Sequence, residues 1–458
     1  MLHTAALLLP EIRAAIQERN WKGLRLLLET LWPQDIHEIL EQLTPAEGVL
    51  LFRLLPKDVA AHVFSELEPD LAERLLRSFT DEEARALLEE MDPDDRTALL
   101  DELPASVVRK LLALLPPEER QEALRLLAYP EDSCGRLMSP EFVEAHEHER
   151  VGTVLNRVIQ KARELPEEVL HEVYVIDRTR HLLGSVTLIQ LRRAPRDQSI
   201  GAIVDRQPVH VSAWDDQEVA ARVMRRYDRL ALPVVDREGR LVGVITVDDV
   251  LDVLEEETAE DFYKFAAVAD PEDRYFSLDI RERIQKRLPW LAGLALLANF
   301  SSMILHRYEG LLQQVLVLAV FIPILNGTAG NTGSQCASFV IRALATGELS
   351  PSFNLRLVRV YLREITGVLV GLALPLSLIV MGSAWIQTHD PRIMLVTALT
   401  MTTAVTVSNT IGFLLPLLAK RVGLDPASIS APFNATLNDA LTLLLYFNIA
   451  RWVLPGPA

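Results

Sequence analysis

The charged residues of this 458-residue chain are distributed so unevenly that they divide it into two kinds of protein. Residues 1–287 hold 57 of the 63 acidic and 37 of the 46 basic residues, a net charge of −20. Residues 288–458 hold only 6 and 9, a net charge of +3. A long segment so poor in charge and so rich in apolar stretches is typical of membrane-spanning helices. The chain is therefore predicted to be multidomain, with a strongly acidic soluble part followed by a membrane-embedded part.

The net negative charge of the soluble part limits the classes of ligand that it is expected to bind. Nucleic acid is not expected, because phosphates select basic patches; cation binding and plain solubility both fit. Cys134 and Cys336 are the only cysteines and form no CxxC pattern, which argues against a disulfide framework or a thiolate metal site. The N-terminus lacks the basic region and long apolar run of a cleavable signal peptide, so the soluble part is expected to stay in the cytoplasm.

Residues 1–130 are predicted to form an all-α helical solenoid. Prolines recur every 11–13 residues from Pro45 to Pro130, with Asp81 filling the one gap. Between them lie short Leu- and Ala-rich patterns whose proline and acidic residues suit helix N-termini. Short helices that cannot bury a face alone are expected to stack on their neighbours.

An α/β pattern with an internal repeat follows. Two pairs of β-rich segments, 171–177 with 182–188 and 230–236 with 241–247, are each joined by a turn and followed by a helix. The two copies lie about 58 residues apart. A long acidic-to-basic helical segment, residues 248–287, is expected to lead into the membrane.

Five stretches approach or exceed the ~20 apolar residues needed to cross a bilayer: 289–305, 312–344, 358–386, 394–418 and 429–453. Basic residues precede the first stretch and gather in two of the four connections, at Arg281, Arg283, Lys286, Arg287, Arg342, Arg356, Arg359, Arg363, Lys420 and Arg421. The positive-inside rule then predicts a cytoplasmic N-terminus and an extracytoplasmic C-terminus.

The second stretch is expected to be broken by the polar, Gly-rich run Asn326–Gln335. Irregular backbone at membrane depth is tolerated only against protein or a water-filled cavity. Asn331 and Gln335 therefore favour a pore lining, and a close helix-packing motif of small residues is the alternative.

Asp439 is the only carboxylate of the last stretch and lies about eleven residues into it, or ~17 Å along a helix. A charge at mid-membrane costs roughly 2.5–3.5 kcal/mol, so it marks a functional site. Asn434, Thr436 and Asn438 add the oxygen atoms that hard cations such as Mg²⁺ prefer. One carboxylate cannot cage a bare Mg²⁺, but it can hold the hydrated ion, and a symmetric dimer would supply two carboxylates. A proton-relay aspartate is the alternative.

The order of these parts resembles the MgtE family of bacterial magnesium channels, and the similarity covers essentially the whole chain. It depends on RLPWL at the first span, GNTGSQ and IRALATGEL in the second, LREITGVLVGL in the third, and GLDPASISAPFNATLNDALTLLLYF at the last. The resemblance implies a helical N domain (1–130), two CBS domains (131–200 and 201–257), a connecting plug helix (258–287) and a five-helix transmembrane pore domain (288–458).

In that family the channel is a homodimer, and the aspartate of a PxxxTxxD pattern, here Pro432, Thr436 and Asp439, recognises hydrated Mg²⁺. The family also closes its gate when cytosolic Mg²⁺ bridges acidic residues. The matching regulatory positions here are Asp94, Asp228, Asp249, Asp252, Glu257, Glu260, Asp261 and Asp425. A solvated helix face is the alternative for any one of them.

Two departures from the family pattern stand out. Ala431 stands where many members have an asparagine before the proline of the last motif. CBS domains that bind adenosine nucleotides use an S/T-x-x-D pattern. The second repeat keeps this pattern as Thr246 and Asp249, while the first has Gln190 at the aspartate position, so ATP binding stays open for one repeat only.

The sequence thus predicts a Mg²⁺-selective, Mg²⁺-gated channel for magnesium uptake and homeostasis in the bacterial inner membrane, and not an enzyme. The alternative is a proton-coupled transporter of divalent cations that titrates Asp439, although the paired half-repeats common in such transporters are missing. An intramembrane aspartyl protease would need two facing aspartates, and the spans offer one.

Overall fold

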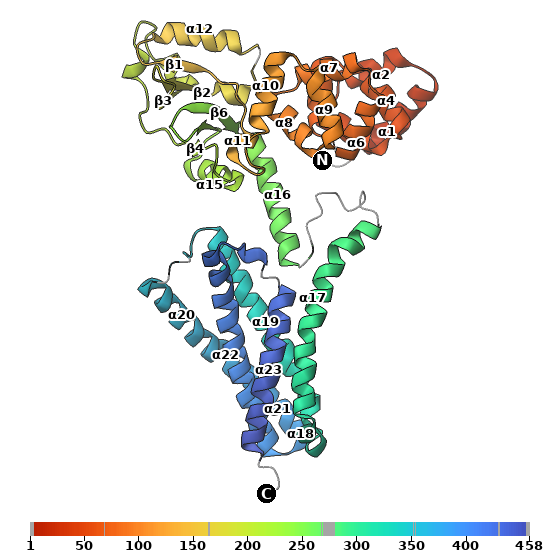
Figure 1. The fold of residues 1–458 in the computed structure, drawn as a ribbon, viewed down its shortest axis with the longest axis vertical. Helices are drawn as coiled ribbons and strands as arrows, with labels where there is room; N and C mark the ends of the chain where they lie inside the picture. The colour runs from red at the N-terminus through yellow and green to blue at the C-terminus, as the bar shows by residue number, and fades with distance from the viewer. Residues whose placement is uncertain are drawn as a thin grey trace. The chain divides into compact units, whose positions relative to one another are not determined.

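The computed structural model describes residues 4–454 apart from 68, 164, 267, 269–279, 351, 353, 429 and 430. The chain divides into two compact units, residues 1–255 (unit 1) and 256–458 (unit 2), and each is described by itself. Figure 1 shows that unit 1 contains short helices and two small sheets, whereas unit 2 contains long helices.

Unit 1 begins with a stack of short helices. They are α1 (Thr4–Gln17), α2 (Trp21–Leu28), α3 (Pro33–Gln42), α4 (Pro45–Phe52), α5 (Lys57–Ser65), α6 (Pro69–Ser78), α7 (Asp81–Glu90), α8 (Pro93–Glu102), α9 (Ala105–Leu114) and α10 (Pro117–Leu126). Helices α1, α3, α5, α7 and α9 pack each on the next, and α4 on α6 and α8 on α10, around one apolar core. The predicted prolines open α4, α6, α8 and α10, where a missing N–H costs nothing. The helical N-terminal domain is thus confirmed.

Two α/β repeats complete unit 1. Their elements are α11 (Cys134–Leu137), β1 (Glu144–His146), α12 (Val151–Lys161), α13 (Glu167–Leu170), β2 (Glu172–Ile176), β3 (Leu182–Thr187), α14 (Leu188–Arg193), η1 (Ile200–Ala202), β4 (Val211–Ser212), α15 (Gln217–Tyr227), β5 (Ala231–Val235), β6 (Leu241–Thr246) and α16 (Val247–Phe265). The sheets have orders β1-β2-β3 and β4-β5-β6, and in both the first pair is parallel and the second antiparallel. The predicted segments form β2, β3, β5 and β6. Strands β1 and β4 were not predicted, because three and two residues are too short to show an alternating pattern.

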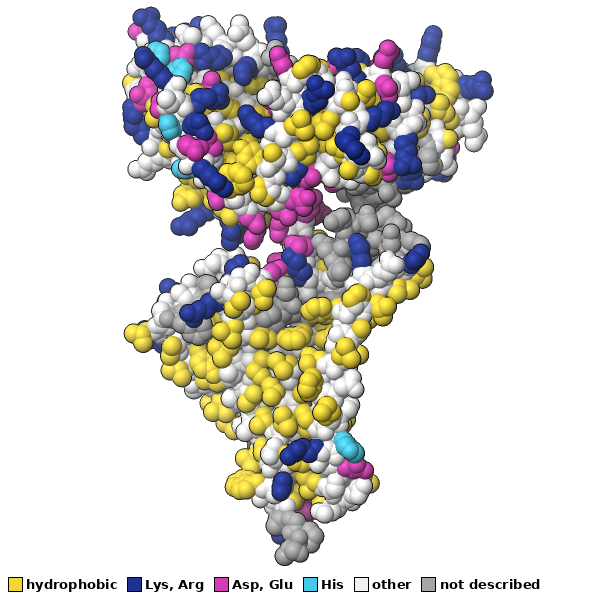
Figure 2. All heavy atoms as spheres, viewed as in Figure 1, with side chains coloured by type: hydrophobic (Ala, Val, Ile, Leu, Met, Phe, Trp, Pro, Cys, Tyr) yellow, Lys and Arg dark blue, Asp and Glu magenta, His cyan; other side chains and the backbone are white. Residues whose placement is uncertain are grey.

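Unit 2 is all helical. Its helices are α17 (Ile280–Arg307), α18 (Glu309–Gln314), α19 (Leu318–Ala345), α20 (Leu355–Val368), the π-helical turn η2 (Leu369–Ala373), α21 (Leu374–Thr388), α22 (Pro391–Val422), the 3₁₀ turn η3 (Pro426–Ser428) and α23 (Ala431–Val453). Among the described residues, three stretches are long and apolar enough to cross a membrane: Arg283–Arg307, Leu355–Thr388 and Pro391–Val422. Helices α19 and α23 have 28 and 23 residues and contain the polar runs. Figure 2 shows hydrophobic side chains covering the middle of unit 2, with lysines and arginines towards its ends.

The prediction that the second span is broken at Asn326–Gln335 is wrong. Helix α19 is continuous through this run. The glycines let neighbouring helices approach: a Cβ on Gly333 would lie 2.5 Å from Asn438 Nδ2 of α23. A Cβ on Gly412 of α22 would collide with the carbonyl oxygen of Gly333 and lie 3.1 Å from Cys336 Cβ. Small residues at this crossing therefore serve close packing, which is the alternative that the sequence left open.

The connecting helix predicted at 258–287 is not one described element. Residues 258–265 continue α16 from the second repeat, and residues 280–287 begin α17, which runs on into the first candidate span. Most of the rest of this segment, residues 267 and 269–279, lies outside the described residues. The acidic and basic halves of the segment thus belong to different helices.

Candidate metal-ion sites

Asp439 lies on α23 on the same face as two other residues of its motif. Pro432, Thr436 and Asp439 are spaced i, i+4 and i+7, which places them on one side of an α-helix. Thr436 Oγ1 donates a hydrogen bond to the Pro432 carbonyl oxygen at 2.8 Å. All three are partly buried. The motif therefore presents one carboxylate beside one hydroxyl, a set that suits a hydrated cation rather than direct coordination of a bare one.

Asn434 and Asn438 occupy a different face of α23. Their side chains are 0% and 1% exposed, and Asn438 Nδ2 donates to Asn434 Oδ1 at 3.1 Å. Asn438 also packs at the position of Gly333 on α19. The structure thus places both asparagines in the interface with α19. The sequence had predicted instead that they line a pore with Asp439. Within the described part of the chain, Asn434 Nδ2 has no hydrogen-bond partner.

Asn331 and Gln335, also predicted to line the pore, lie one turn apart on α19 and are exposed in the single chain. Their helix is fixed to its neighbours by short polar contacts. Ser334 Oγ donates to the Ala431 carbonyl oxygen at 3.2 Å, and Ser408 Oγ of α22 donates to that of Ala329. Polar contacts therefore join α19 both to α22 and to the start of α23.

A second candidate site lies in unit 1, where the first turn of α8 faces the first turn of α16. Burial raises the pKa of Asp94 well above its ordinary value, and the nearby carboxylate of Asp249 raises it further. Asp94 Oδ1 is fully covered and has no partner among the described residues. Burial also raises the pKa of Asp249, although Thr246 Oγ1 donates to its Oδ2 at 2.6 Å. A buried carboxylate oxygen without a donor fits a cation.

More carboxylates surround this pair than the sequence identified. Burial raises the pKa of Asp95 to about 6, and Asp92 and Glu66 raise it further, against a hydrogen bond from Ser65. Burial raises the pKa of Asp92 too, and Asp248 adds to that effect. We call Asp92, Asp94, Asp95, Asp249 and Asp252 together the acidic cluster. Its α8 members follow Pro93 directly, in a run of helix-start acids that resembles ordinary capping, which explains why the sequence singled out only Asp94.

Asp252 joins the edge of this cluster. Burial raises its pKa, and Glu66 and Asp248 contribute. Asp228 instead ends α15 in the left-handed conformation, at φ 50°, with no contact that links it to the cluster among the described residues. Figure 2 shows acidic side chains gathered around α16.

The remaining predicted regulatory residues belong to unit 2. Glu257 and Asp261 lie on α16. Glu260, also on α16, and Asp425, between α22 and η3, both contact the ammonium group of Lys264. Lys264 was not predicted, and its i+4 spacing from Glu260 was the available sign.

No group of three or more His, Cys, Asp or Glu side chains is arranged to hold a metal ion within the described ranges. The acidic cluster is therefore not a preformed cage. Since Mg²⁺ dehydrates reluctantly and keeps several waters, carboxylates placed a few ångströms apart can still hold it through those waters.

The S/T-x-x-D pattern that would suit a nucleotide forms hydrogen bonds at the start of a helix in this structure. Asp249 accepts hydrogen bonds from the backbone N and Oγ1 of Thr246, at the start of α16. Gln190 does the same for Thr187 at the start of α14. The two repeats thus keep one local structure with different acceptors, which accounts for the pattern without a ribose.

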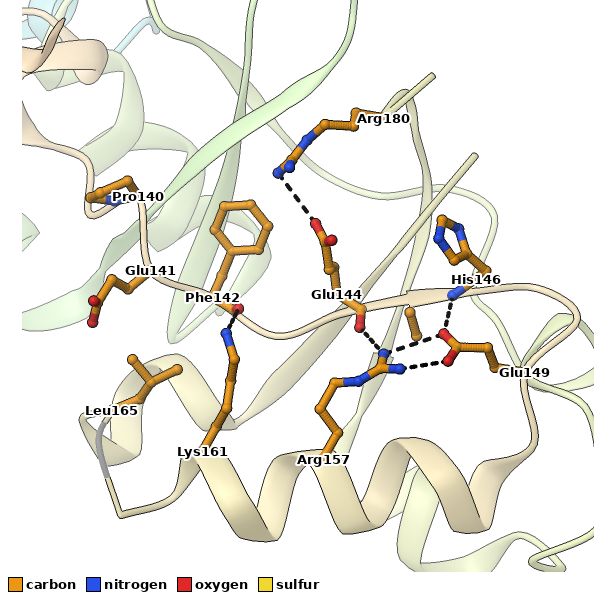
Figure 3. Close-up of a pocket in the computed structure, with 11 residues that line it drawn as sticks. Pro140, Glu141, Phe142, Glu144, His146, Glu149, Arg157, Lys161, Leu165 and Arg180 are labelled. Carbon is orange, nitrogen blue, oxygen red and sulfur yellow. Dashed lines mark hydrogen bonds and ion pairs between the residues drawn. The ribbon is translucent and has the colours of Figure 1, made fainter. Parts of the chain in front are cut away.

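A cleft of about 520 Å³ lies in the first repeat beside β1 and α12 (Figure 3). Its basic side chains are already engaged. Arg157 pairs with Glu149 at 2.5 Å, Arg180 pairs with Glu144 at 3.2 Å, and Lys161 Nζ donates to a backbone carbonyl. The cleft therefore lacks the net positive charge that a triphosphate would need.

Three family models match successive parts of the chain: the MgtE intracellular N domain at 31–132, the CBS domain at 200–256, and the MgtE divalent cation transporter at 322–449. Over almost its whole length the chain is similar to the magnesium transporter MgtE of Thermus thermophilus. The two are 39% identical over 448 residues, which cover 97% of this chain and 98% of the relative. The chain belongs to the MgtE family. The Enterococcus faecalis MgtE is 36% identical over 334 residues, 73% of this chain and 72% of that one.

Solved structures of the soluble parts of a Mg²⁺ channel and a magnesium transporter are similar to unit 1. The cytosolic domain of the Mg²⁺ channel MgtE in complex with ATP is 35% identical with a TM-score of 0.51, covering 54% of this chain and 99% of that one. The soluble part of a magnesium transporter is 28% identical with a TM-score of 0.51, covering 56% and 100%. The predicted fold class, a helical N domain followed by CBS domains and membrane-spanning helices, is thus confirmed.

Proposed function

We propose that this MgtE family member is a Mg²⁺-selective channel that mediates magnesium uptake and closes when cytosolic Mg²⁺ is high. The observation that supports the pore assignment is the face formed by Pro432, Thr436 and Asp439 on α23. It presents the one carboxylate of the helix beside a hydroxyl, without a basic residue in the middle of α23 to neutralise it. Passage of a hydrated ion involves no covalent chemistry, so we propose no enzymatic activity.

The channel is proposed to be a homodimer. One carboxylate provides too little charge for a doubly charged ion, and a two-fold axis next to α23 would supply a second Asp439. Asn331 and Gln335 are exposed on α19 of the single chain, so a second copy or a water-filled path would give them polar partners. Asn434 and Asn438 would then support the pore from behind by fixing α23 against α19.

Closure is proposed to depend on the acidic cluster. Burial, and then repulsion among the carboxylates, raises the pKa of Asp94 and Asp95. This repulsion is proposed to weaken the contact between α8 and α16 when no cation is bound. Mg²⁺ that binds the compact arrangement better than the separated one stabilises it by mass action. Asp94, Asp249 and Asp252 are the proposed regulatory residues in unit 1; Asp228, Glu257, Glu260, Asp261 and Asp425 remain proposals by family position.

We propose a bacterial inner-membrane location with the N-terminus in the cytoplasm and the C-terminus outside. The supporting feature is the excess of arginine and lysine in alternate connections. ATP is a weaker candidate ligand, supported by the ATP complex of the similar cytosolic domain. Against it, Thr246 and Asp249 already hydrogen-bond to each other.

The test of the pore is Mg²⁺ uptake by cells that lack other Mg²⁺ importers. Asp439→Ala is expected to abolish uptake at matched expression, whereas Glu309→Gln, which removes an exposed carboxylate of α18, is expected to keep it. Uptake by Asp439→Ala at the wild-type rate would refute the pore assignment. The proton-coupled alternative predicts flux that follows the pH gradient, so flux into proteoliposomes that is independent of that gradient excludes it.

A further inference from the structure

Lys264 joins the end of α16 to the connection between α22 and α23. Its Nζ contacts Glu260 Oε1, one turn earlier on α16, and lies 3.1 Å from Asp425 Oδ2. All three side chains are about one-third exposed, at 32%, 34% and 36%. One ammonium group therefore contacts two carboxylates from segments about 160 residues apart in the sequence.

Asp425 is held in the orientation that this contact needs. Its Oδ1 accepts a hydrogen bond from the backbone N of Ala427 at 2.9 Å, at the start of η3, which leaves Oδ2 directed at Lys264. Glu260 lies four residues before Lys264, the spacing at which a glutamate and a lysine on a helix attract each other. Partial burial alone would lower the pKa of Lys264, but the hydrogen bonds to Glu260 and Asp425 raise it, so the ammonium stays charged.

Two facing carboxylates without a cation would repel each other and weaken the contact between the two segments. Both were candidates for Mg²⁺, yet here a side chain of the same protein supplies the positive charge. An ammonium group donates directly to carboxylates, whereas Mg²⁺ keeps its waters and demands octahedral geometry. The pair cannot hold both cations at once in the same place.

We propose that Lys264 is the resident cation of the Glu260–Asp425 pair and that Mg²⁺ must displace it before bridging these carboxylates. This inference rests on the proposed Mg²⁺-dependent closure and specifies how one of its sites is regulated. The end of α16 is then held to the α22–α23 connection even when Mg²⁺ is scarce. In this proposal, the acidic cluster of unit 1 is the site at which closure depends on Mg²⁺.

The test is hydrogen–deuterium exchange of the full-length protein in lipid nanodiscs, followed by mass spectrometry of peptides covering 256–265 and 423–428. In EDTA, Lys264→Met is expected to exchange about two- to fivefold faster than wild type in both peptides, the factor that loss of a partly exposed ion pair gives. Added Mg²⁺ is expected to slow this exchange again, because the freed carboxylates can then bind it. The matched control is Lys110→Met, which removes an exposed ion pair, 2.8 Å long, to Asp81.

Lys264→Arg keeps the positive charge and is expected to exchange like wild type in EDTA. Exchange in Lys264→Met that equals wild type in EDTA would overturn the inference. So would exchange in Lys264→Arg as fast as in Lys264→Met, or faster exchange in Lys264→Met that Mg²⁺ does not slow. Failure of the channel proposal would appear in the uptake of Asp439→Ala instead, which is a separate measurement.

Discussion

Asp95→Asn is expected to stabilise the soluble part of the protein at pH 8 in the absence of divalent cations. Burial, with Asp92 and Glu66 nearby, raises the pKa of Asp95 from 3.8 to about 6. The folded protein therefore binds this proton more tightly than the unfolded chain does. Its stability falls as the pH rises through the interval from about 4 to about 6, and above that interval the whole cost is present.

The size of the effect follows from that shift. About two pKa units correspond to roughly 3 kcal/mol at ~1.36 kcal/mol per unit. Asp95 is partly exposed, and solvent screening reduces this figure, so a gain of about 1–3 kcal/mol is expected for the asparagine variant at pH 8. At pH 5, which lies midway between the two pKa values, only about half of this cost has built up, so about half of the gain is expected there.

The assay is urea unfolding of the isolated soluble part in EDTA at pH 5, 6, 7 and 8. A separate soluble part is suitable because two similar cytosolic or soluble domains were solved in that form. Asp197→Asn, in an exposed turn, is the matched control and is expected to change little at any pH. An Asp95→Asn variant no more stable than wild type at pH 8, or equally stabilised at pH 5, would refute the electrostatic explanation.

Two further changes test the packing. Gly412→Ala should lower the thermal stability of the detergent-solubilised protein, by about 1–3 kcal/mol, because the added Cβ meets the Gly333 carbonyl oxygen; Gly382→Ala, with nothing within 4 Å of its Cβ, is the control, and equal melting of both variants would contradict the close crossing. Thr246→Ala should destabilise the soluble part by about 1 kcal/mol, because the buried carboxylate of Asp249 loses the hydroxyl donor of Thr246. An unchanged urea midpoint would show that this hydrogen bond contributes nothing.

Local patterns predicted most of the secondary structure. Many prolines of the N domain mark helix starts because proline suits the first turn of a helix, and five of the helices begin at one: α3, α4, α6, α8 and α10. The hairpins β2–β3 and β5–β6 followed from runs of β-branched residues between turns. The break expected in α19 was wrong, since local helix propensity is weak evidence about a glycine that a neighbouring helix needs to approach closely.

The candidate sites were predicted less completely than the fold. Asp439 was identified because a lone carboxylate among apolar residues is costly. Its neighbours in sequence were assumed to share its surroundings, but Asn434 and Asn438 point into the interface with α19. Asp95 and Lys264 were not among the predicted site residues, because each depends in part on a residue of another segment, Glu66 for Asp95 and Asp425 for Lys264.

The sequence by itself determined the division into an acidic soluble part and an apolar membrane part, the helical and α/β character of the soluble part, and the position of Asp439. These depend on composition and short-range periodicity, which the chain holds in any conformation. The tertiary structure decided which carboxylates meet at α8 and α16, which asparagines are buried, and that an ammonium lies between Glu260 and Asp425. Electrostatic interactions depend on distance in space, and only the fold sets those distances.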